Sequence, residues 1–254
     1  MLAGVTNFRD FGGYPTVDAR RVRTGTLFRS AQLSGATPED FAKLAALGIS
    51  VVVDLRRAVE RRRHPTGAWT AGCRMISCDL IEDHDPWGAF LGDSDLNAAS
   101  IRDYLTNFCL GLPLEPSYID LFSRFFEALA TTEGALLVHC TGGKDRTGLI
   151  VALTHCLLGV HRDDILADYL LTNQVWHFDV HGAAVASGIA EAAGRGCEPA
   201  AVRAVMEVDA AYLDTAFGAI EAGAGSLDAY FETVLGISPS VRDAIMTRLL
   251  IDGD

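Results

Sequence analysis

The chain has 254 residues, of which 49% are hydrophobic and 21% are charged, a balance that provides a core and excludes intrinsic disorder. The net charge of −12 argues against a nucleic-acid partner and against attachment to an anionic membrane surface. We expect residues 1–254 to form a single domain, because the length is that of one large domain.

The first half of the chain alternates between short strands and helices, as α/β proteins do. A helix is predicted over Pro38–Leu47, because Thr37 can cap its start and Gly48 can end it. Ile49–Asp54 is short, apolar and β-branched, which is typical of a buried parallel strand. Two further strands are predicted over Thr26–Arg29 and Arg74–Ser77.

The second half contains one more strong strand and then becomes helical. From Asp79 to Pro113 the pattern loosens into a long connection with short helices. A helical stripe follows over Pro116–Ala130, and Ala135–Val138 is typical of a second buried strand. The later helices are predicted over Asp145–Leu158, His161–Leu171, Asp209–Ala222, Leu227–Leu235 and Ser238–Ile251, with the Ala- and Gly-rich stretch Gly182–Gly196 as a separator.

These elements together predict an α/β fold. We expect a short, largely parallel central sheet with helices on both faces and a helical C-terminal part. The strands Ile49–Asp54 and Ala135–His139 should lie at its centre, because they are the most apolar.

The sequence holds neither a recognisable targeting segment nor a metal-binding motif. Its start lacks the basic residues and apolar stretch of a signal peptide, and no apolar run is long enough to span a bilayer. We therefore expect a cytoplasmic location and no stable membrane insertion, with secretion by a signal-less route left open. The six cysteines form no C-x-x-C pair, so we expect reduced thiols rather than a zinc site. The oligomeric state is left open.

A glycine-containing loop joins the strand Ala135–His139 to the next helix. It begins at Cys140, continues Thr-Gly-Gly-Lys-Asp and closes at Arg146, followed by Thr-Gly. Loops of this kind turn successive backbone N–H groups into a concavity at a helix N-terminus, which is an anion site suited to phosphate. The carboxyl end of a strand is also where α/β sheets place their ligands. The loop is therefore the candidate catalytic site.

Each residue type in the loop suits phosphate chemistry. The N–H groups and the helix dipole would stabilise a thiolate at Cys140 and make it a nucleophile. Arg146 can hold two phosphoryl oxygens through its planar fork. The glycines let the backbone approach the phosphate, and His139 would support the loop from behind. The candidate substrate-binding residues are Thr141, Gly142, Gly143, Lys144, Arg146 and Thr147, the last of which could hydrogen-bond the sulfur.

Other functions compete with phosphate-ester hydrolysis at this loop. An ATP-binding loop needs Gly-Lys followed by Ser or Thr, and Asp145 after Lys144 breaks that motif. A phosphate-binding module without turnover stays open, as does a sulfurtransferase that carries sulfur on Cys140. The residues from Lys144 to Thr147 fit a phosphatase better than a sulfurtransferase.

The loop resembles the phosphate loop of the cysteine-dependent protein tyrosine phosphatase superfamily. Its HCxxGKDRTG form, from His139 to Gly148, is similar to that of the bacterial group typified by the mycobacterial secreted tyrosine phosphatase of the B type. Segments 79–113 and 175–199 match that group poorly and are candidate lid segments within the single domain. Further blocks look like the group and occur in its order: Asn7–Tyr14, Gly25–Ser30, Val53–Arg56 with Glu60, and Asp168–Asn173.

The resemblance implies a hydrolase that needs no metal or other cofactor and works in two steps. Cys140 would attack phosphorus and form a phosphocysteine, which water then hydrolyses. The implied substrates are phosphotyrosine first, then phosphoserine or phosphothreonine and phosphoinositides, since an extra cation at Lys144 suits more than one phosphate. The implied general acid is Asp145, with Asp79 and Asp85 as alternatives. Capping of the following helix is a competing role for Asp145.

A basic run over residues 56–64 is the main cationic feature outside the loop. It could line the approach to the phosphate site, but we expect Arg61–Arg63 to form a solvated helix face. For Arg56 we expect a structural ion pair with Glu60 or Asp54.

Overall fold

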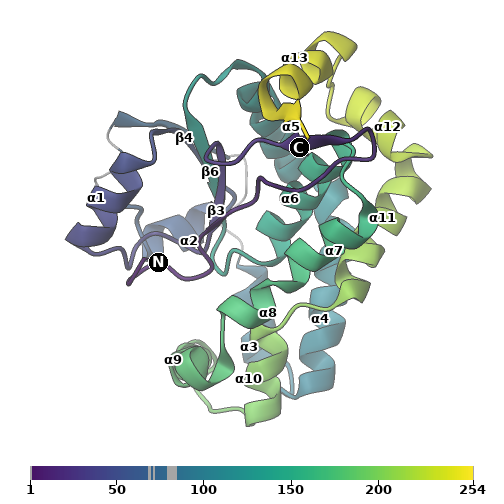
Figure 1. Cartoon of the computed structure of the whole chain (residues 1–254). Coiled ribbons are helices and arrows are strands. Elements are labelled where there is room, and N and C mark those ends of the chain that lie inside the picture. Colours follow the sequence, from purple (N-terminus) through teal and green to yellow (C-terminus); the bar gives the residue numbers. More distant parts are fainter. Residues whose placement is uncertain (1, 68–69, 71, 79–84, 254) are drawn as a thin grey trace.

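The computed structural model describes residues 2–67, 70, 72–78 and 85–253. Its main sheet has five strands in the order β1-β3-β6-β4-β5. β3 (Leu27–Ser30), β6 (Ala135–His139), β4 (Ile49–Asp54) and β5 (Arg74–Ser77) are parallel, and β1 (Arg9–Asp10) runs antiparallel to β3 at one edge. The predicted α/β fold, with β4 and β6 at the centre of the sheet, is confirmed (Figure 1).

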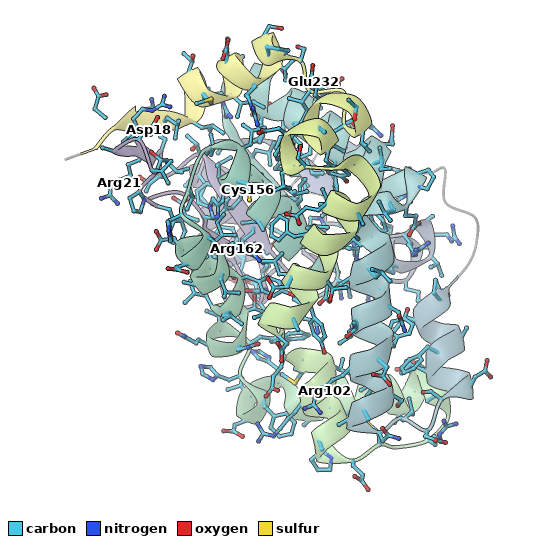
Figure 2. All side chains as sticks on the ribbon, turned by 90° about the vertical axis from the view of Figure 1, so that its right-hand side faces the viewer. Asp18, Arg21, Arg102, Cys156, Arg162 and Glu232 are labelled. Carbon is cyan, nitrogen blue, oxygen red and sulfur yellow. The ribbon has the colours of Figure 1, made fainter. Side chains whose placement is uncertain are left out.

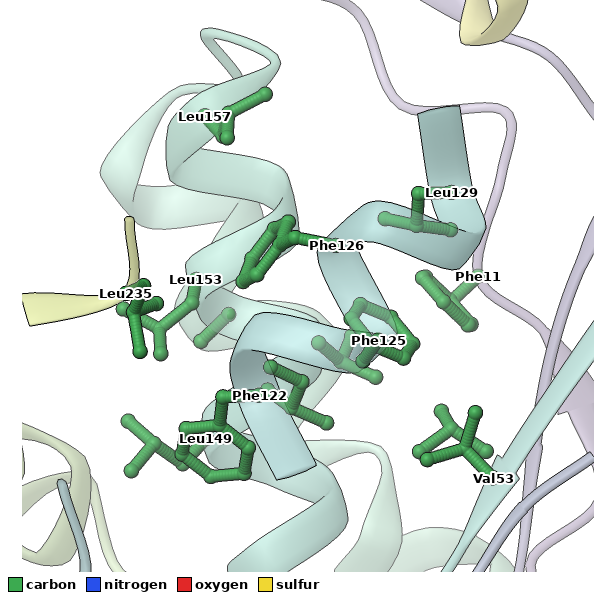
Figure 3. Close-up of a cluster of buried hydrophobic side chains, with 14 of the residues drawn as sticks. Phe11, Val53, Phe122, Phe125, Phe126, Leu129, Leu149, Leu153, Leu157 and Leu235 are labelled. Atoms are coloured by element: carbon green, nitrogen blue, oxygen red, sulfur yellow. The ribbon is translucent and has the colours of Figure 1, made fainter. Parts of the chain in front are cut away.

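The two faces of the sheet have separate cores, because successive residues of a strand point to opposite sides. Val53 of β4 belongs to the larger core, with side chains of α5 (Pro116–Thr131) and α6 (Asp145–Leu157). Val52 belongs to the smaller core under α1 (Pro38–Ala46). Figure 3 shows Val53 in one cluster with Phe125 of α5 and Leu149 of α6. Helices therefore cover both faces, as predicted.

Local sequence signals set several of the observed boundaries. β4 and β5 have the predicted bounds, and the Thr37 side chain caps α1 by accepting a hydrogen bond from the Asp40 amide at 3.2 Å. Several other observed elements overlap or adjoin segments that the sequence predicts. They are α2 (Ala58–Arg63), the 3₁₀ turn η2 (Leu112–Leu114), α7 (Arg162–Leu170), α8 (Thr172–Val175), α11 (Ala210–Ala224), α12 (Leu227–Ala229) and η3 (Tyr230–Val234).

Three predicted features were wrong. The stretch Gly182–Gly196 is no separator, because most of it lies inside α9 (Phe178–Ala193), where alanines, the strongest helix formers, outnumber the glycines. The loosely patterned connection contains α4 (Ala98–Gly111), a 14-residue helix rather than a short one. The last helix, α13 (Pro239–Leu249), ends early because β7 (Leu250–Asp252) pairs with β2 (Arg20–Val22).

Four helices pack together as a helical lobe: α3 (Pro86–Asp93), α4, α9 and α10 (Pro199–Met206). Figure 1 and Figure 2 both place this lobe at one end of the molecule, and Arg102 of α4 marks it in Figure 2. The lobe brings together the helices in the described part of the two candidate lid segments, which are far apart in the sequence. Their role as lids stays a prediction.

None of the helices in the described part of the chain is both long enough and apolar enough to cross a membrane.

Candidate active site

The loop over residues 140–146, called the phosphate loop below, lies at the carboxyl end of β6 in the middle of the sheet. Cys140 follows directly after β6 and is 2% exposed, and α6 begins at Asp145. A helix N-terminus carries partial positive charge and free N–H groups. The local chain path therefore places the cysteine and an anion-stabilising helix end at the two ends of one short loop.

Two glycines allow close packing of the phosphate loop. Gly143 has a φ of +65°, a left-handed conformation that favours glycine. A Cβ atom there would also lie 2.4 Å from the carbonyl oxygen of Ser30, so the loop backbone packs directly against the end of β3. At Gly142 a Cβ atom would lie 3.3 Å from the ring of Trp176. Side chains at these positions would push the loop away from β3 and from Trp176.

A buried polar network holds the loop at Gly143. Asn7 and Arg29 both donate to the Gly143 carbonyl oxygen, at 2.8 and 2.9 Å. Arg29 also forms a 2.7 Å ion pair with Asp168, and both residues are almost completely buried. Burial would raise the pKa of Asp168, but the charge of Arg29 holds it below its ordinary value. Three sequence blocks that resembled the phosphatase group thus converge on one loop carbonyl.

Arg146 is held by the carboxylate of Glu60. Its Nη1 and Nη2 donate to Oε2 and Oε1 at 2.6 and 2.8 Å, which makes a bidentate ion pair. The Thr141 hydroxyl also donates to Glu60. Burial would raise the pKa of Glu60, yet the charge of Arg146 lowers it to about 2. Burial likewise opposes the charge of Arg146, but Glu60 keeps the pKa of the guanidinium well above its ordinary value.

Sequence reasoning did not place Glu60 in the site. Its spacing from Arg56 suggested a pair within one helix, whereas Arg56 instead pairs with Asp54, at 2.7 Å, the other expected partner. The sequence did contain a signal for this pair. A buried guanidinium such as that of Arg146 needs a carboxylate partner, and Glu60 is one of the acidic residues in the blocks that resemble the phosphatase group.

His139 lies behind the loop and is completely buried. Its Nδ1 is 3.1 Å from the carbonyl oxygen of Cys140, and its Nε2 is 3.7 Å from Asp54. Burial lowers the pKa of His139. This arrangement suits a neutral ring that supports the start of the loop.

The ammonium group of Lys144 is bound to the helical lobe. It donates to the carbonyl oxygens of Val205 and Glu207, at 2.5 and 3.0 Å, at the C-terminal end of α10. Carbonyls at a helix C-terminus lack partners within the helix and carry partial negative charge, so they stabilise a cation. Lys144 is 4% exposed and connects the phosphate loop to the lobe.

The three candidate acids have different surroundings. Asp145 is the first residue of α6 and not its N-cap, and its Oδ1 is buried without a hydrogen-bond partner among the described residues. Asp85 accepts from the Gly88 amide at 3.0 Å as the N-cap of α3, and it pairs with Arg63 at 2.8 Å. Asp79 lies outside the described residues. Asp145 is thus the candidate acid that lies in the loop with a free carboxylate oxygen.

Thr147 is fully buried, one residue after Arg146. Its hydroxyl makes no hydrogen bond within the described part of the chain, so the expected bond to the Cys140 sulfur is not formed.

Most of the basic run is engaged in ion pairs and backbone contacts. Arg57 pairs with Glu115 at 3.0 Å, and Arg61 is half-buried and donates to the carbonyl oxygens of Arg56 and Cys78. The expected solvated face is limited to Arg62 and Arg63, which are exposed.

Known proteins match the chain over most of its length. A model of the tyrosine phosphatase family matches residues 1–251. A putative tyrosine-protein phosphatase of Cupriavidus necator is 35% identical over 241 residues, which cover 92% of this chain and 82% of that protein. The triple specificity protein phosphatase PtpB of Mycobacterium tuberculosis is 33% identical over 193 residues, covering 68% of each chain. A tyrosine-protein phosphatase of Nostoc commune is 29% identical over 171 residues, which cover 62% of this chain and 52% of that protein.

Proposed function

Because the chain belongs to the tyrosine phosphatase family, we propose that it hydrolyses phosphomonoesters through a phosphocysteine on Cys140, without a metal or other cofactor. One observation carries the proposal: Glu60 holds Arg146 in a bidentate ion pair at the end of the loop that Cys140 opens. A guanidinium held in this way is already oriented, so little freedom is lost when its remaining N–H groups bind a phosphoryl group.

The proposed reaction has two displacement steps. The Cys140 thiolate forms a bond to phosphorus while the bond from phosphorus to the leaving oxygen breaks, and a general acid protonates that oxygen. Water then attacks phosphorus and loses a proton to the same group, the bond from sulfur to phosphorus breaks, and inorganic phosphate leaves. Arg146 holds two phosphoryl oxygens in both steps.

The other residues of the loop have supporting roles in this proposal. We propose that the loop binds the phosphoryl oxygens through its backbone N–H groups. The residues that would supply these groups are Thr141, Gly142, Gly143 and Lys144. Thr147 would assist the hydrolytic step, and His139 would support the loop. Asp145 is our proposed general acid, since its Oδ1 is left without a hydrogen-bond partner among the described residues.

Phosphotyrosine is the first substrate we propose. The relatives named tyrosine-protein phosphatases support it. We propose phosphoserine, phosphothreonine and phosphoinositides as further substrates, since one relative is named a triple specificity protein phosphatase, which indicates more than one class of substrate. The contacts of Lys144 favour substrates with a single phosphate, because its ammonium group is bound to the end of α10 and must leave those carbonyls before it can bind a second phosphate.

The proposed mechanism predicts that Cys140→Ser abolishes turnover but keeps phosphate-ester binding, because a serine hydroxyl at this position is a far weaker nucleophile than a thiolate. Turnover of an aryl phosphate, a phosphotyrosine peptide, a phosphoserine peptide and phosphoinositides would be measured in EDTA. Cys156→Ser, on the far part of α6, is the matched control and should keep wild-type rates. Activity retained by Cys140→Ser would refute the nucleophile, and activity lost in EDTA would refute the metal-free mechanism.

A further inference from the structure

A groove of about 430 Å³ opens beside the phosphate loop. Thr141 and Gly142 of the phosphate loop line it, so the groove borders the candidate phosphate site. This volume is within the range of small-ligand sites, roughly 300–1,000 Å³. A phosphorylated residue seated in the loop would therefore have its neighbouring groups beside this groove.

The lining residues of the N-terminal part are fixed to the phosphate loop and to one another by hydrogen bonds. The Gln32 amide donates to the Thr141 carbonyl oxygen at 3.0 Å, and the Ala31 amide donates to the Thr6 carbonyl oxygen at 3.0 Å. Asp40 also holds the N-terminal segment by accepting from the Gly4 amide at 2.7 Å. This part of the lining is therefore preformed.

The rest of the lining comes from Trp176, directly after α8, and from α9. The ring of Trp176 lies against Gly142, and Val185 and Gly188 of α9 also line the groove. An aromatic ring beside the phosphate loop and two small or apolar helix residues give this side an apolar surface.

The chemistry of the lining is neutral. The described residues that line the groove include no lysine, arginine, histidine, aspartate or glutamate, and their polar side chains include Thr6, Gln32 and Ser34. A second phosphate there would have no cationic partner, and an unpaired charge in such a groove is costly. A peptide main chain instead offers one N–H and one C=O per residue, which hydroxyl and amide groups can satisfy.

We propose that this groove binds the stretch of peptide next to the phosphorylated residue and selects neutral side chains there. The inference rests on the proposed phosphatase function and adds to it a peptide subsite. It assigns the groove to a protein substrate rather than to the headgroup of a phosphoinositide.

The test fills the groove without touching the phosphate loop. Gly188 lines the groove and is exposed on α9, and an added Cβ atom would meet no heavy atom within 4 Å, so Gly188→Leu should add bulk to the groove lining. Gly218→Leu on α11 is the matched control, since Gly218 is also an exposed helical glycine with open space around it. The probes are a phosphotyrosine peptide with neutral flanking residues, phosphotyrosine alone, and a soluble inositol phosphate.

For Gly188→Leu we expect kcat/KM on the peptide to fall roughly tenfold relative to kcat/KM on phosphotyrosine, the usual size of a lost pocket contact. Gly218→Leu should leave both values unchanged. An unchanged ratio, an equal loss on both substrates, or a loss confined to the inositol phosphate would overturn the peptide subsite.

Failure of the phosphatase function would be recognised separately. A wild-type chain that hydrolyses neither phosphotyrosine nor the peptide would contradict the proposed function. Binding of the unphosphorylated peptide, measured by fluorescence anisotropy, would then test the peptide subsite separately from catalysis. Weaker binding to Gly188→Leu than to wild type would support the subsite, and equal binding would overturn it.

Discussion

At the scale of single residues, the site is organised by the pair of Arg146 and Glu60. A bidentate pair fixes both the position and the plane of the guanidinium before any substrate arrives. Glu60 also accepts from Thr141, so one carboxylate connects the first loop residue after the cysteine with the arginine that closes the loop. We therefore propose that Glu60 is a positioning residue that acts through Arg146.

Glu60→Gln should lower kcat/KM on an aryl phosphate by roughly 10- to 100-fold, because a misplaced binding group costs about that much rate. The amide keeps the size of the side chain but cannot accept two charged hydrogen bonds. Glu115→Gln, which breaks the pair with Arg57, is the control and should have a much smaller effect. Steady-state kinetics on both folded variants would measure the difference. Equal losses would show that Glu60 has only a general structural role.

Asp145→Asn should slow the hydrolysis of esters with poor leaving groups more than that of activated aryl phosphates, because only poor leaving groups depend on protonation. A series of aryl phosphates with increasing leaving-group pKa would be compared for wild type and variant, as the slope of log kcat/KM. An equal loss of kcat/KM across the whole series would contradict Asp145 as the general acid and point to Asp79 or Asp85 instead.

At the scale of elements, Lys144 connects the phosphate loop to α10. The link is a charged hydrogen bond to the C-terminal carbonyls of a short helix, and such bonds contribute about 1.5–3 kcal/mol. We therefore expect the position of α10, and through it the packing of the helical lobe, to be coupled to the state of the loop.

Lys144→Met should speed hydrogen exchange of the backbone amides in α10 by roughly tenfold or more, because the helix loses a charged hydrogen bond at its end. Exchange measured by mass spectrometry on peptides covering residues 199–207 would detect it. Lys43→Met on α1, across the sheet, should leave these peptides unchanged. Unchanged exchange in Lys144→Met would mean that the lobe is held without this link.

The elements that could be predicted from sequence are those with strong local signals. β4 is a continuous apolar run, and α1 has a cap and a proline at its start. β2 and β7 could not be predicted, because each has three residues and forms only by pairing with a distant partner. The site follows the same division between local and distant signals. The chemistry of the phosphate loop could be predicted from residues that are adjacent in the sequence. The contacts of Lys144 and the partner of Arg146 could not, because they depend on tertiary packing.

At the scale of the whole molecule, stability depends on carboxylates that stay charged. The charge of Arg146 holds the pKa of Glu60 at about 2 against the effect of burial. Burial also opposes the charge of Asp40, but backbone N–H donors from Gly4 and Ala3 lower its pKa to about 2. The charge of Arg29 likewise holds the pKa of Asp168 below its ordinary value, against the effect of burial.

These depressed pKa values predict acid unfolding. A carboxylate with a lower pKa in the folded than in the unfolded state stabilises the fold above its unfolded pKa of about 4, and this contribution disappears as the pH falls toward the folded pKa. Burial also lowers the pKa of His139, so the unfolded chain takes up a proton there below about pH 6.5 while the folded chain does not. The urea midpoint should therefore begin to fall below about pH 6.5 and fall further between about pH 4 and pH 2, where the carboxylates are protonated.

Asp168→Asn provides the matched comparison for this pH dependence. It should lose about 3–5 kcal/mol at pH 7, since it leaves Arg29 buried without its charge partner, and its acid transition should be shallower. Urea titrations of both proteins from pH 7 to pH 2 would check both statements. A wild-type midpoint that stays constant down to pH 2 would contradict the assignment.

The contacts at the Gly143 carbonyl also have a consequence for folding order. Asn7 before β1 and Arg29 of β3 reach this one oxygen directly, and Asp168 of α7 reaches it through Arg29. Contacts between residues so far apart in sequence form late, because the loops between them must close first. A fragment that ended before α7 would contain every residue of the phosphate loop and still lack one of its supports. We therefore expect catalytic competence to be a late product of folding, so that returning enzyme activity marks completion of the long-range topology rather than formation of the local secondary structure.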